Sequence, residues 1–237
     1  MYKLSIIIPI FNEEQRLGSS FQIIKKFFQK KLSKDIEVVF VNDGSTDKTD
    51  QILKKFIKQN SKKIKLNYIN YKLNKGKGFA VKKGVLASKN SWILVCDADM
   101  SVLPGQFSIW YKKGLIKENN IAYYGSRIHK NSKVKALFLR KLFGGVLSLL
   151  LSLLFHIKLS DTQCGFKVFN SKYIKKIFRE IKCNGYAYDV EITLLLKKRK
   201  IKIIELPLKW KHKSGSKVSL IKDSIKIFCD LIILRLK

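Results

Sequence analysis

The sequence is poor in acidic residues. It has 17 Asp and Glu against 49 Lys and Arg, which gives a formal net charge of +32 over 237 residues. Such an excess favours an acidic partner, namely nucleic acid, an anionic membrane face or a phosphorylated substrate. Because the lysines lie throughout the chain, part of the excess reflects composition rather than a dedicated basic patch.

Cysteine and histidine motifs are absent too. None of the four cysteines forms a Cys-x-x-Cys pair, so the sequence suggests no zinc or redox site, and a reduced, cytosolic setting is the simplest interpretation. Cys164 is expected to be a packing residue rather than a nucleophile. The three histidines, His129, His156 and His212, share no motif and suggest no general base.

The chain also lacks a hydrophobic run long enough to span a membrane. The apolar run at residues 4–8 is too short for a signal peptide and is expected to be the first strand. The longest uncharged run, residues 142–157, is shorter than the roughly 20 residues that a spanning helix needs. We expect it to be a core helix or a helix lying in the membrane interface.

Neither a Pro/Ser-rich linker nor an internal repeat divides the chain. We therefore expect a single domain over residues 1–211, with functional halves at 1–125 and 126–211. Residues 212–237 are expected to form a basic amphipathic tail, since their apolar residues recur at helical spacing. Such a tail could lie on a membrane, dock a partner, or pack on the domain itself.

Apolar runs alternate with helical patterns along the chain. Strands are expected at residues 4–8, 36–41, 65–70 and 92–96, with helices between them. The second half adds a helix from Pro104, strands at 121–124, 166–169 and 202–206, and a helix at 188–198. Repeated strand–helix units predict an α/β fold with a mostly parallel sheet and helices on both faces. Membrane-facing helices are expected in the second half.

Candidate binding residues follow each of the first four predicted strands. Ligands of such sheets bind outside the carboxyl ends of the strands, so we expect these residues to converge at one edge. They are Phe11, Asn12, Glu13, Asp43, Lys77, Asp97 and Asp99.

Asp97 and Asp99 form the centre of this set. If the strand continues through Ala98, the side chains of Asp97 and Asp99 point the same way, whereas a bend at the end of the strand would change this. Two such carboxylates repel each other unless a cation lies near them. Hard oxygen ligands suit Mg²⁺ or Mn²⁺, with phosphate oxygens completing the shell. The alternative is that both are solvated loop acids.

Ordered motifs run through the whole chain. In the first half they are Ile7-Ile8-Pro9-Ile10-Phe11-Asn12-Glu13-Glu14, Val41-Asn42-Asp43-Gly44-Ser45-Thr46-Asp47, Asn74-Lys75-Gly76-Lys77-Gly78 and Asp97-Ala98-Asp99. In the second half they are Gly125-Ser126-Arg127, Asp161-Thr162-Gln163-Cys164-Gly165-Phe166-Lys167, Tyr188-Asp189-Val190-Glu191 and Gly215-Ser216-Lys217-Val218. The first set resembles the family-two inverting glycosyltransferases of GT-A (Rossmann-like) fold. The second is similar to their dolichyl-phosphate β-glucosyltransferase or polyprenyl-phosphate glycosyltransferase branch.

The resemblance implies a role for each matching residue. The nucleotide pocket would be lined by Pro9, Phe11, Asn12, Glu13, Asp43, Lys77 and Asp97, with Asp43 accepting a hydrogen bond from the base. Asp99, together with Asp97, would bind Mg²⁺ or Mn²⁺ on the diphosphate. The phosphate and acceptor groups would be held by Arg127, Arg140 and Lys217. Asp161 and Gln163 would position the acceptor phosphate or sugar hydroxyls, or shape their loop.

Two departures from the family pattern affect these expectations. In the mannosyl branch the acid pair is often followed by Leu-Gln, and the Gln helps to bind the metal. Here Met100 and Ser101 follow the pair, so this extra ligand is not expected. Members of the glucosyl branch often begin with a spanning helix, whereas this sequence begins with a predicted strand. We therefore expect peripheral attachment at the cytoplasmic, inner face of a membrane.

The resemblance implies transfer of a hexose, glucose, from UDP-glucose to a polyprenyl or dolichyl phosphate with inversion at the anomeric carbon. A phosphate monoester is largely ionised at neutral pH, so it can attack without a general base. Alternatives are transfer of mannose from GDP-mannose, or transfer to a glycan hydroxyl with Asp189 as the base. Asp189 therefore joins Asp97, Asp99 and Arg127 as a candidate catalytic residue.

The expected partners are a nucleotide sugar, a lipid phosphate and a membrane surface. Binding two anionic substrates at one site would require several cations, and Lys167 is a further candidate for one of them. A basic, inactive membrane- or nucleic-acid-binding protein is a rival outside enzymes. We expect no nucleic acid, because the carboxylates at the strand ends would repel a phosphate backbone. The sequence leaves the oligomeric state open.

Overall fold

A seven-stranded sheet organises the described part of the chain, which covers residues 2–30, 35–135, 151–152, 154–213, 229–232 and 234 in a computed structural model. Its strands are β1 (Leu4–Ile10), β2 (Ile36–Asp43), β3 (Lys65–Tyr71), β4 (Trp92–Val95), β5 (Ile121–Ser126), β7 (Lys167–Asn170) and β8 (Lys202–Pro207). Their order across the sheet is β3-β2-β1-β4-β7-β5-β8.

The sheet is mostly parallel, as the sequence predicts. β1 pairs in parallel with both β2 and β4, β2 with β3, and β5 with β8. The exception is β7, which runs antiparallel between β4 and β5 and so begins at the edge where those strands end. A second sheet joins the short strands β6 (Lys133–Lys135) and β9 (Lys209–Lys211).

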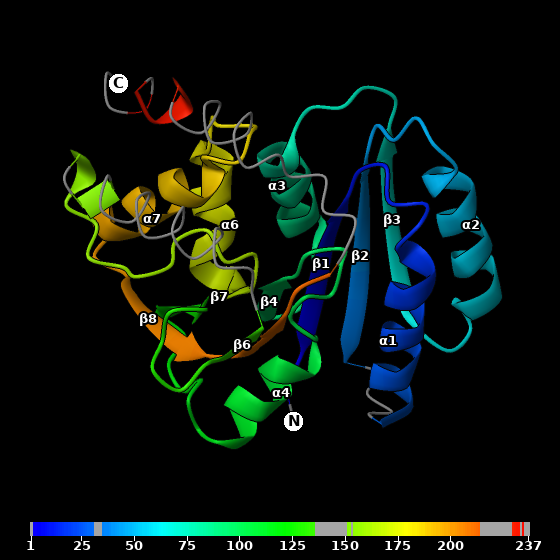
Figure 1. Ribbon diagram of the computed structural model, residues 1–237, viewed down its shortest axis with the longest axis horizontal. Helices are drawn as coiled ribbons and strands as arrows, with labels where there is room; N and C mark the ends of the chain where they lie inside the picture. Colours follow the sequence, from blue (N-terminus) through cyan, green and yellow to red (C-terminus); the bar gives the residue numbers. More distant parts are fainter. Residues whose placement is uncertain are drawn as a thin grey trace.

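Helices cover both faces of the large sheet (Figure 1), which confirms the predicted class. On one face lie α1 (Leu17–Lys30), α2 (Thr49–Asn60) and α4 (Gly105–Lys112); on the other lie α3 (Lys77–Ala87), α6 (Ser171–Glu180) and α7 (Tyr188–Lys198). Successive strand side chains point to opposite faces, so Ile6 and Ile8 pack with the first group and Ile7 with the second. Burial on both faces explains why β1 is apolar almost throughout.

The structure differs from the sequence prediction at several element boundaries. β1 continues through Pro9, because β4 pairs with β1 only as far as Ile7 and no ladder bond from Pro9 is needed on that side. The first helix begins at Leu17, since the carbonyl of Glu13 already accepts from the amides of Arg16 and Leu17 in a turn. The sequence analysis also missed α6, β6 and β9. The start of α6 is capped by Asn170, whose side chain accepts from the amide of Lys172.

Both expected halves share one sheet. The predicted boundary after residue 125 falls inside β5, so the division into functional halves stays a prediction. Most of the run at 142–157 and most of the tail lie outside the described residues, and with them the expected membrane-facing helices. Within the described residues, no helix is both long and apolar enough to cross a membrane. Leu231 of the tail is buried beside Ala187 and Val190, so this residue packs on the domain itself.

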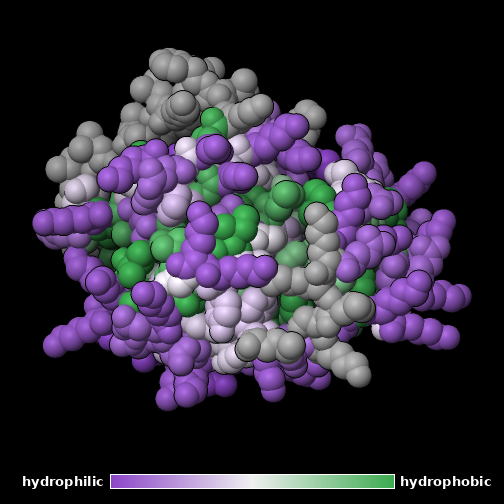
Figure 2. All heavy atoms as spheres, turned by 90° about the horizontal axis from the view of Figure 1, so that it is seen from below, coloured by the Kyte–Doolittle hydropathy of each residue, from purple (hydrophilic) through white to green (hydrophobic). Residues whose placement is uncertain are grey.

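Hydrophilic side chains cover much of the face seen in Figure 2, with apolar atoms exposed between them. This spread agrees with the even distribution of lysine along the sequence.

The packing of α3 on the sheet generates the first prediction. An alanine Cβ at Gly84 would lie 2.3 Å from Cγ2 of Ile7 and 3.1 Å from Cγ2 of Val41, both buried β-branched residues that cannot yield. Gly84→Ala should lower the free energy of unfolding by about 1–3 kcal/mol in urea titrations. Gly18→Ala in α1 is the matched control, because its Cβ would meet nothing within 4 Å. That control should be neutral or stabilising by up to about 1 kcal/mol; equal effects of the two variants would contradict the packing.

Candidate active site

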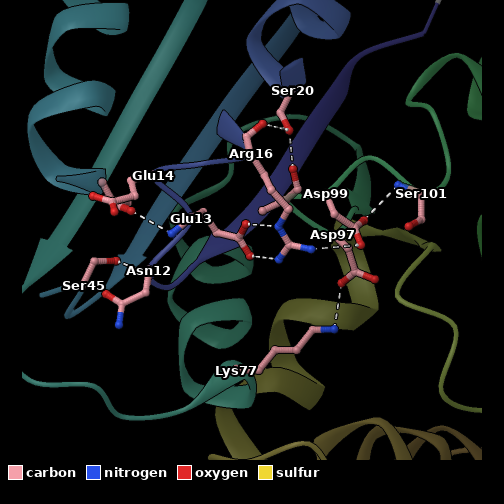
Figure 3. Close-up of polar contacts among 12 residues, drawn as sticks. Asn12, Glu13, Glu14, Arg16, Ser20, Ser45, Lys77, Asp97, Asp99 and Ser101 are labelled. Carbon is pink, nitrogen blue, oxygen red and sulfur yellow. Dashed lines mark hydrogen bonds and ion pairs between the residues drawn. The ribbon is translucent and has the colours of Figure 1, made fainter. Parts of the chain in front are cut away.

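The loops after β1 and β2 are tied together at the carboxyl edge of the sheet (Figure 3). The amide of Asn12 donates to Oγ of Ser45 over 2.9 Å, and Oδ1 of Asn12 accepts from the amide of Thr46 over 2.8 Å. Asn12 adopts a left-handed backbone with φ of 52°, which asparagine tolerates better than most residues. Beside it Phe11 is 39% exposed, an open aromatic ring at the edge where a nucleotide is expected.

Asp43 ties the loop after β2 to the loop after β3. Its Oδ1 accepts from the amide of Lys75, and its Oδ2 accepts from the amide of Gly76, each over 2.9 Å. The side chain of Asn74 donates to the same Oδ2 over 3.0 Å. Asp43 is buried and both of its oxygens have protein partners, so it shapes the loop that leads into α3. Its contact with a base stays a prediction.

Lys77, the first residue of α3, reaches the acid pair. Its Nζ lies 2.7 Å from Oδ1 of Asp97, and its side chain is 23% exposed. Burial would lower the pKa of Lys77, but Asp97 and Asp189 outweigh it and raise that pKa above the ordinary lysine value. Burial would likewise raise the pKa of Asp97, but Lys77 above all holds it below the usual aspartate range. Both groups are therefore charged at neutral pH.

Asp99 has a cationic neighbour that the sequence analysis missed. The Arg16 guanidinium binds Glu13 through Nε and Nη2, and its Nη1 lies 3.9 Å from Oδ2 of Asp99 (Figure 3). Glu13 thus holds Arg16 toward the acid pair. The spacing of three residues between Glu13 and Arg16 was the available signal, but it indicated only a local pair.

The acid pair fits a divalent cation. Oδ1 of Asp99 accepts from the amide of Ser101 over 2.9 Å, and Oδ1 of Asp97 is held by Lys77, so the orientation of each carboxylate is fixed. Within the described residues, no group of three or more His, Cys, Asp or Glu side chains could hold a metal. A metal here would therefore take two carboxylates from the protein, and hard oxygens from its ligand would complete the shell.

Arg127 follows β5 and is locked to Asp161. Its backbone amide and Nε donate to Oδ2 of Asp161 over 2.9 and 2.8 Å, and Nη2 lies 2.7 Å from Oδ1. Glu205 in turn accepts from the amides of Ser160 and Asp161. Asp161 thus positions Arg127, and the loop that carries Gln163 is anchored in β8.

Lys167 and Asp189 form a buried ion pair, with side chains that are 1% and 3% exposed. Nζ of Lys167 lies 2.6 Å from Oδ1 of Asp189 and donates to the carbonyl of Cys164 over 2.7 Å. Burial raises the pKa of Asp189 above the usual aspartate value, although Lys167 and Lys77 oppose the shift. Lys167 is thus not an exposed cation. Asp189 faces Lys167, and its proposed role as a base stays a prediction.

The remaining candidates fall into three groups. Pro9 is buried within β1, behind the loop that carries Phe11. Gln163 lies beside Arg127 in the lining of a cavity. Arg140 and Lys217 lie outside the described residues.

Burial raises the pKa of the Cys164 thiol to about 12, in agreement with the packing role expected for it.

Both the sequence and the fold of this chain match known proteins. A family model described as "Glycosyl transferase family 2" matches residues 5–178. The dolichyl-phosphate beta-glucosyltransferase of Saccharomyces cerevisiae is 35% identical, over 98% of this chain and 74% of its own length. The human protein of the same name is 31% identical, over 99% of this chain and 75% of its own length.

Solved structures show the fold. Glucosyl-3-phosphoglycerate synthase from Mycobacterium tuberculosis, in complex with UDP, matches with a TM-score of 0.68 at 16% identity, over 99% of this chain and 80% of that one. The same enzyme in complex with Mn²⁺, UDP-glucose and glycerol 3-phosphate matches with a TM-score of 0.66 at 17% identity, over 98% and 79% of the two chains. The fold is the GT-A, Rossmann-like fold that the motifs imply.

The buried ion pair generates the second prediction. Lys167→Met leaves Asp189 buried without its partner, which should lower the free energy of unfolding by about 3–5 kcal/mol. Changing both residues, Lys167→Met with Asp189→Leu, should recover most of that loss. The control is Arg199→Met, which breaks the exposed pair with Glu180 and should cost no more than about 1 kcal/mol.

The loss of unfolding free energy caused by Lys167→Met should also depend on pH. Without the ammonium, the pKa of Asp189 rises further above its unfolded value of about 3.9. A carboxyl whose pKa is higher in the folded protein than in the unfolded chain stabilises the fold at pH values below the pKa of the unfolded chain. That stabilisation is lost as the pH rises through the pKa of the folded protein. Urea titrations should therefore show a smaller defect at pH 4.5 than at pH 7.5. An equal defect at both values would show that the missing charge is not its cause.

Proposed function

Because the chain belongs to glycosyl transferase family 2, we propose that it transfers glucose from UDP-glucose to a dolichyl or related polyprenyl phosphate. The chain is a glycosyltransferase by family. The sugar and the acceptor are inferred from the name shared by relatives that match it over nearly its whole length. The observation that carries the proposal is the pairing of Asp97 and Asp99 with Lys77 and Arg16 at the carboxyl edge of the sheet.

This arrangement suits a nucleoside-diphosphate donor. Asp97 and Asp99 would hold Mg²⁺ or Mn²⁺, which when bound offsets the charge that grows on the diphosphate as the sugar leaves. Lys77 keeps Asp97 ionised and oriented, and the amide of Ser101 orients Asp99. Phe11, Asn12 and Glu13 form the wall of the nucleotide site after β1, with Pro9 behind them, and Asp43 fixes the loop after β3 that presents Lys77.

The acceptor requires no general base. A phosphate monoester has a second pKa near ~6, so its oxygen is already anionic at neutral pH and can attack the anomeric carbon opposite the leaving group. Such an attack inverts the anomeric centre. Asp189, buried against Lys167, is better placed to balance charge than to take a proton from a substrate. This observation favours a phosphate acceptor over a glycan hydroxyl.

The acceptor phosphate would be held by Arg127, which Asp161 orients, with Arg140 and Lys217 as further cations from outside the described residues. A long-chain lipid must be met at a bilayer, so we propose that the protein works peripherally on the inner face of a membrane. The basic composition would support binding to anionic lipid, at about 1 kcal/mol for each lysine or arginine near the surface.

The direct test uses labelled UDP-glucose, GDP-mannose and UDP-galactose with dolichyl phosphate, with and without Mg²⁺ or Mn²⁺. Label should enter the organic phase from UDP-glucose when metal is present. Transfer from GDP-mannose would assign the mannosyl alternative. Transfer from no donor in any combination would sink the proposal.

The acid pair generates a mutational prediction. Asp99→Asn should lower kcat/KM for glucose transfer by at least about 100-fold, because the amide is a weaker metal ligand and no longer offsets Arg16. Thermal unfolding should change little. Glu180→Gln is the matched control, since it removes one carboxylate from an exposed pair with Arg199. If Asp99→Asn and the control were equally active, the metal role of Asp99 would be wrong.

The absence of a general base generates a prediction for pH. Lys77 holds the pKa of Asp97 below the usual aspartate range, so Asp97 is ionised throughout pH 5 to 8. Its titration therefore does not contribute to any rise of kcat/KM in that interval. The value of kcat/KM for the acceptor should therefore rise with a midpoint near ~6, set by the acceptor phosphate alone. A phosphorothioate acceptor, which ionises at lower pH, should move the midpoint down. A midpoint that stays in place would point to a base on the enzyme.

A further inference from the structure

The small sheet of β6 and β9 has two unlike faces. Its strands pair in parallel, with Lys133 opposite Lys209 and Val134 opposite Trp210. Successive strand residues point to opposite faces, so Lys133, Lys209 and Lys211 lie on one face. Val134 and Trp210 lie on the other and pack against the main core, where Trp210 is 8% exposed. The three lysines, which we call the lysine face, are all exposed.

Among the described residues, no carboxylate pairs with the lysine face. The ion pairs found there involve none of its three lysines. The stretches of sequence that contain the two strands, residues 119–160 and 206–222, have no Asp or Glu at all. The lysine face therefore presents uncompensated positive charge, which attracts an anionic partner.

The spacing of the three lysines suits an extended partner. Residues two apart on a strand lie about 7 Å from each other, and neighbouring strands lie about 5 Å apart. Three ammonium groups are therefore spread over the surface of a sheet rather than gathered around one point. Such a face matches a layer of anionic headgroups better than it matches a single phosphate.

The chain leaves this small sheet at a telling edge. Because β6 and β9 run parallel, both end at the same edge. β6 ends at Lys135, ahead of the uncharged run at residues 142–157, and β9 ends at Lys211, where the predicted tail at 212–237 begins. These are the two segments for which the sequence allows a membrane contact. The lysine face thus adjoins the points from which the chain enters both of them.

The small sheet is also tied to the loop that carries Arg127. Oγ of Ser132 donates to the carbonyl of Ser126 over 2.6 Å and accepts from the amide of Leu208 over 3.0 Å. Arg127 and Trp210 line the same cavity. The lysine face and the cation proposed for the acceptor phosphate therefore belong to neighbouring, connected parts of the surface.

We propose that the lysine face is the surface with which the protein contacts the anionic headgroups of a membrane. The inference rests on the proposed function, since a long-chain lipid phosphate as acceptor brings the protein to a bilayer. Contact through the lysine face places Arg127 close to the headgroup layer, where the acceptor phosphate lies. Ile128, which follows Arg127 and is 56% exposed, offers an aliphatic side chain to the lipid at that point.

The test measures binding to vesicles. The full chain and the triple variant Lys133→Gln/Lys209→Gln/Lys211→Gln are sedimented with phosphatidylcholine vesicles that contain or lack phosphatidylserine. The triple variant should bind the anionic vesicles at least about 10-fold more weakly than the wild type, because each lysine near anionic lipid strengthens binding. High salt should shrink this difference, since it screens exposed charges. Equal binding of the two proteins to anionic vesicles at low salt would overturn the proposal.

The matched control removes three exposed lysines elsewhere. Lys55, Lys62 and Lys63 lie in α2 and the turn after it, beyond α1 from β6 (Figure 1). The variant Lys55→Gln/Lys62→Gln/Lys63→Gln has the same net charge as the test variant and should bind anionic vesicles within about 2-fold of the wild type. A loss as large as that of the test variant would show that net charge alone drives binding, which also overturns the proposal.

Turnover separates this inference from the proposed function. With dolichyl phosphate in anionic vesicles, the triple variant should show a raised KM for the acceptor and an unchanged kcat. With a short, water-soluble prenyl phosphate and no vesicles, it should match the wild type. If the wild type transfers no glucose while the triple variant still loses vesicle binding, the surface assignment stands and the function fails. If the wild type transfers glucose and both proteins bind vesicles alike, the function stands and the assignment fails.

A DNA duplex is the other polyanion to test. Its binding to the wild type and to the triple variant is measured in the same buffer as the vesicle binding. Loss of duplex binding with unchanged vesicle binding would assign the lysine face to nucleic acid and overturn the proposal. The expected result is the loss of vesicle binding.

Discussion

Repulsion between two carboxylates at the end of a buried strand is the constraint on which this site depends. Cations from two other elements reach the pair: Lys77, from the start of α3, binds Asp97, and Arg16, from the turn before α1, lies 3.9 Å from Asp99. Each cation is itself held in place, Arg16 by Glu13 and Lys77 by a loop anchored on Asp43. The polar residues at the strand ends are therefore linked into one network of charges, which is the arrangement on which the proposed metal and diphosphate site rests.

The fold and the shared edge of the candidate residues were predictable from the sequence because both follow from short-range patterns. Apolar runs that alternate with helical periodicity predict a parallel sheet, and the carboxyl ends of parallel strands must share an edge. The antiparallel strand β7 was not predictable, since its four residues carry no signal of direction. Nor was Arg16, because an arginine three residues after Glu13 gives no indication that it also approaches Asp99 in space.

The second half shows the same limit more clearly. Lys167 was one cation among many in a lysine-rich sequence, yet the structure buries it against Asp189. Which lysine becomes buried depends on where β7 and α7 meet, and that is a tertiary contact without a local pattern. Sequence motifs thus predicted well which strand-end residues share an edge, and predicted poorly which charged side chains pair behind that edge.

The acid pair is proposed to bind its metal together with the diphosphate rather than alone. Only two carboxylates are available from the described residues, and both already face cations. Titration of Mn²⁺ by electron paramagnetic resonance, with and without UDP, tests this most directly. Mn²⁺ should bind weakly to the free protein and at least about 10-fold more tightly when UDP is saturating, with the same enhancement of UDP affinity by Mn²⁺. Equal Mn²⁺ affinity in both conditions would show that the diphosphate plays no part in holding the metal.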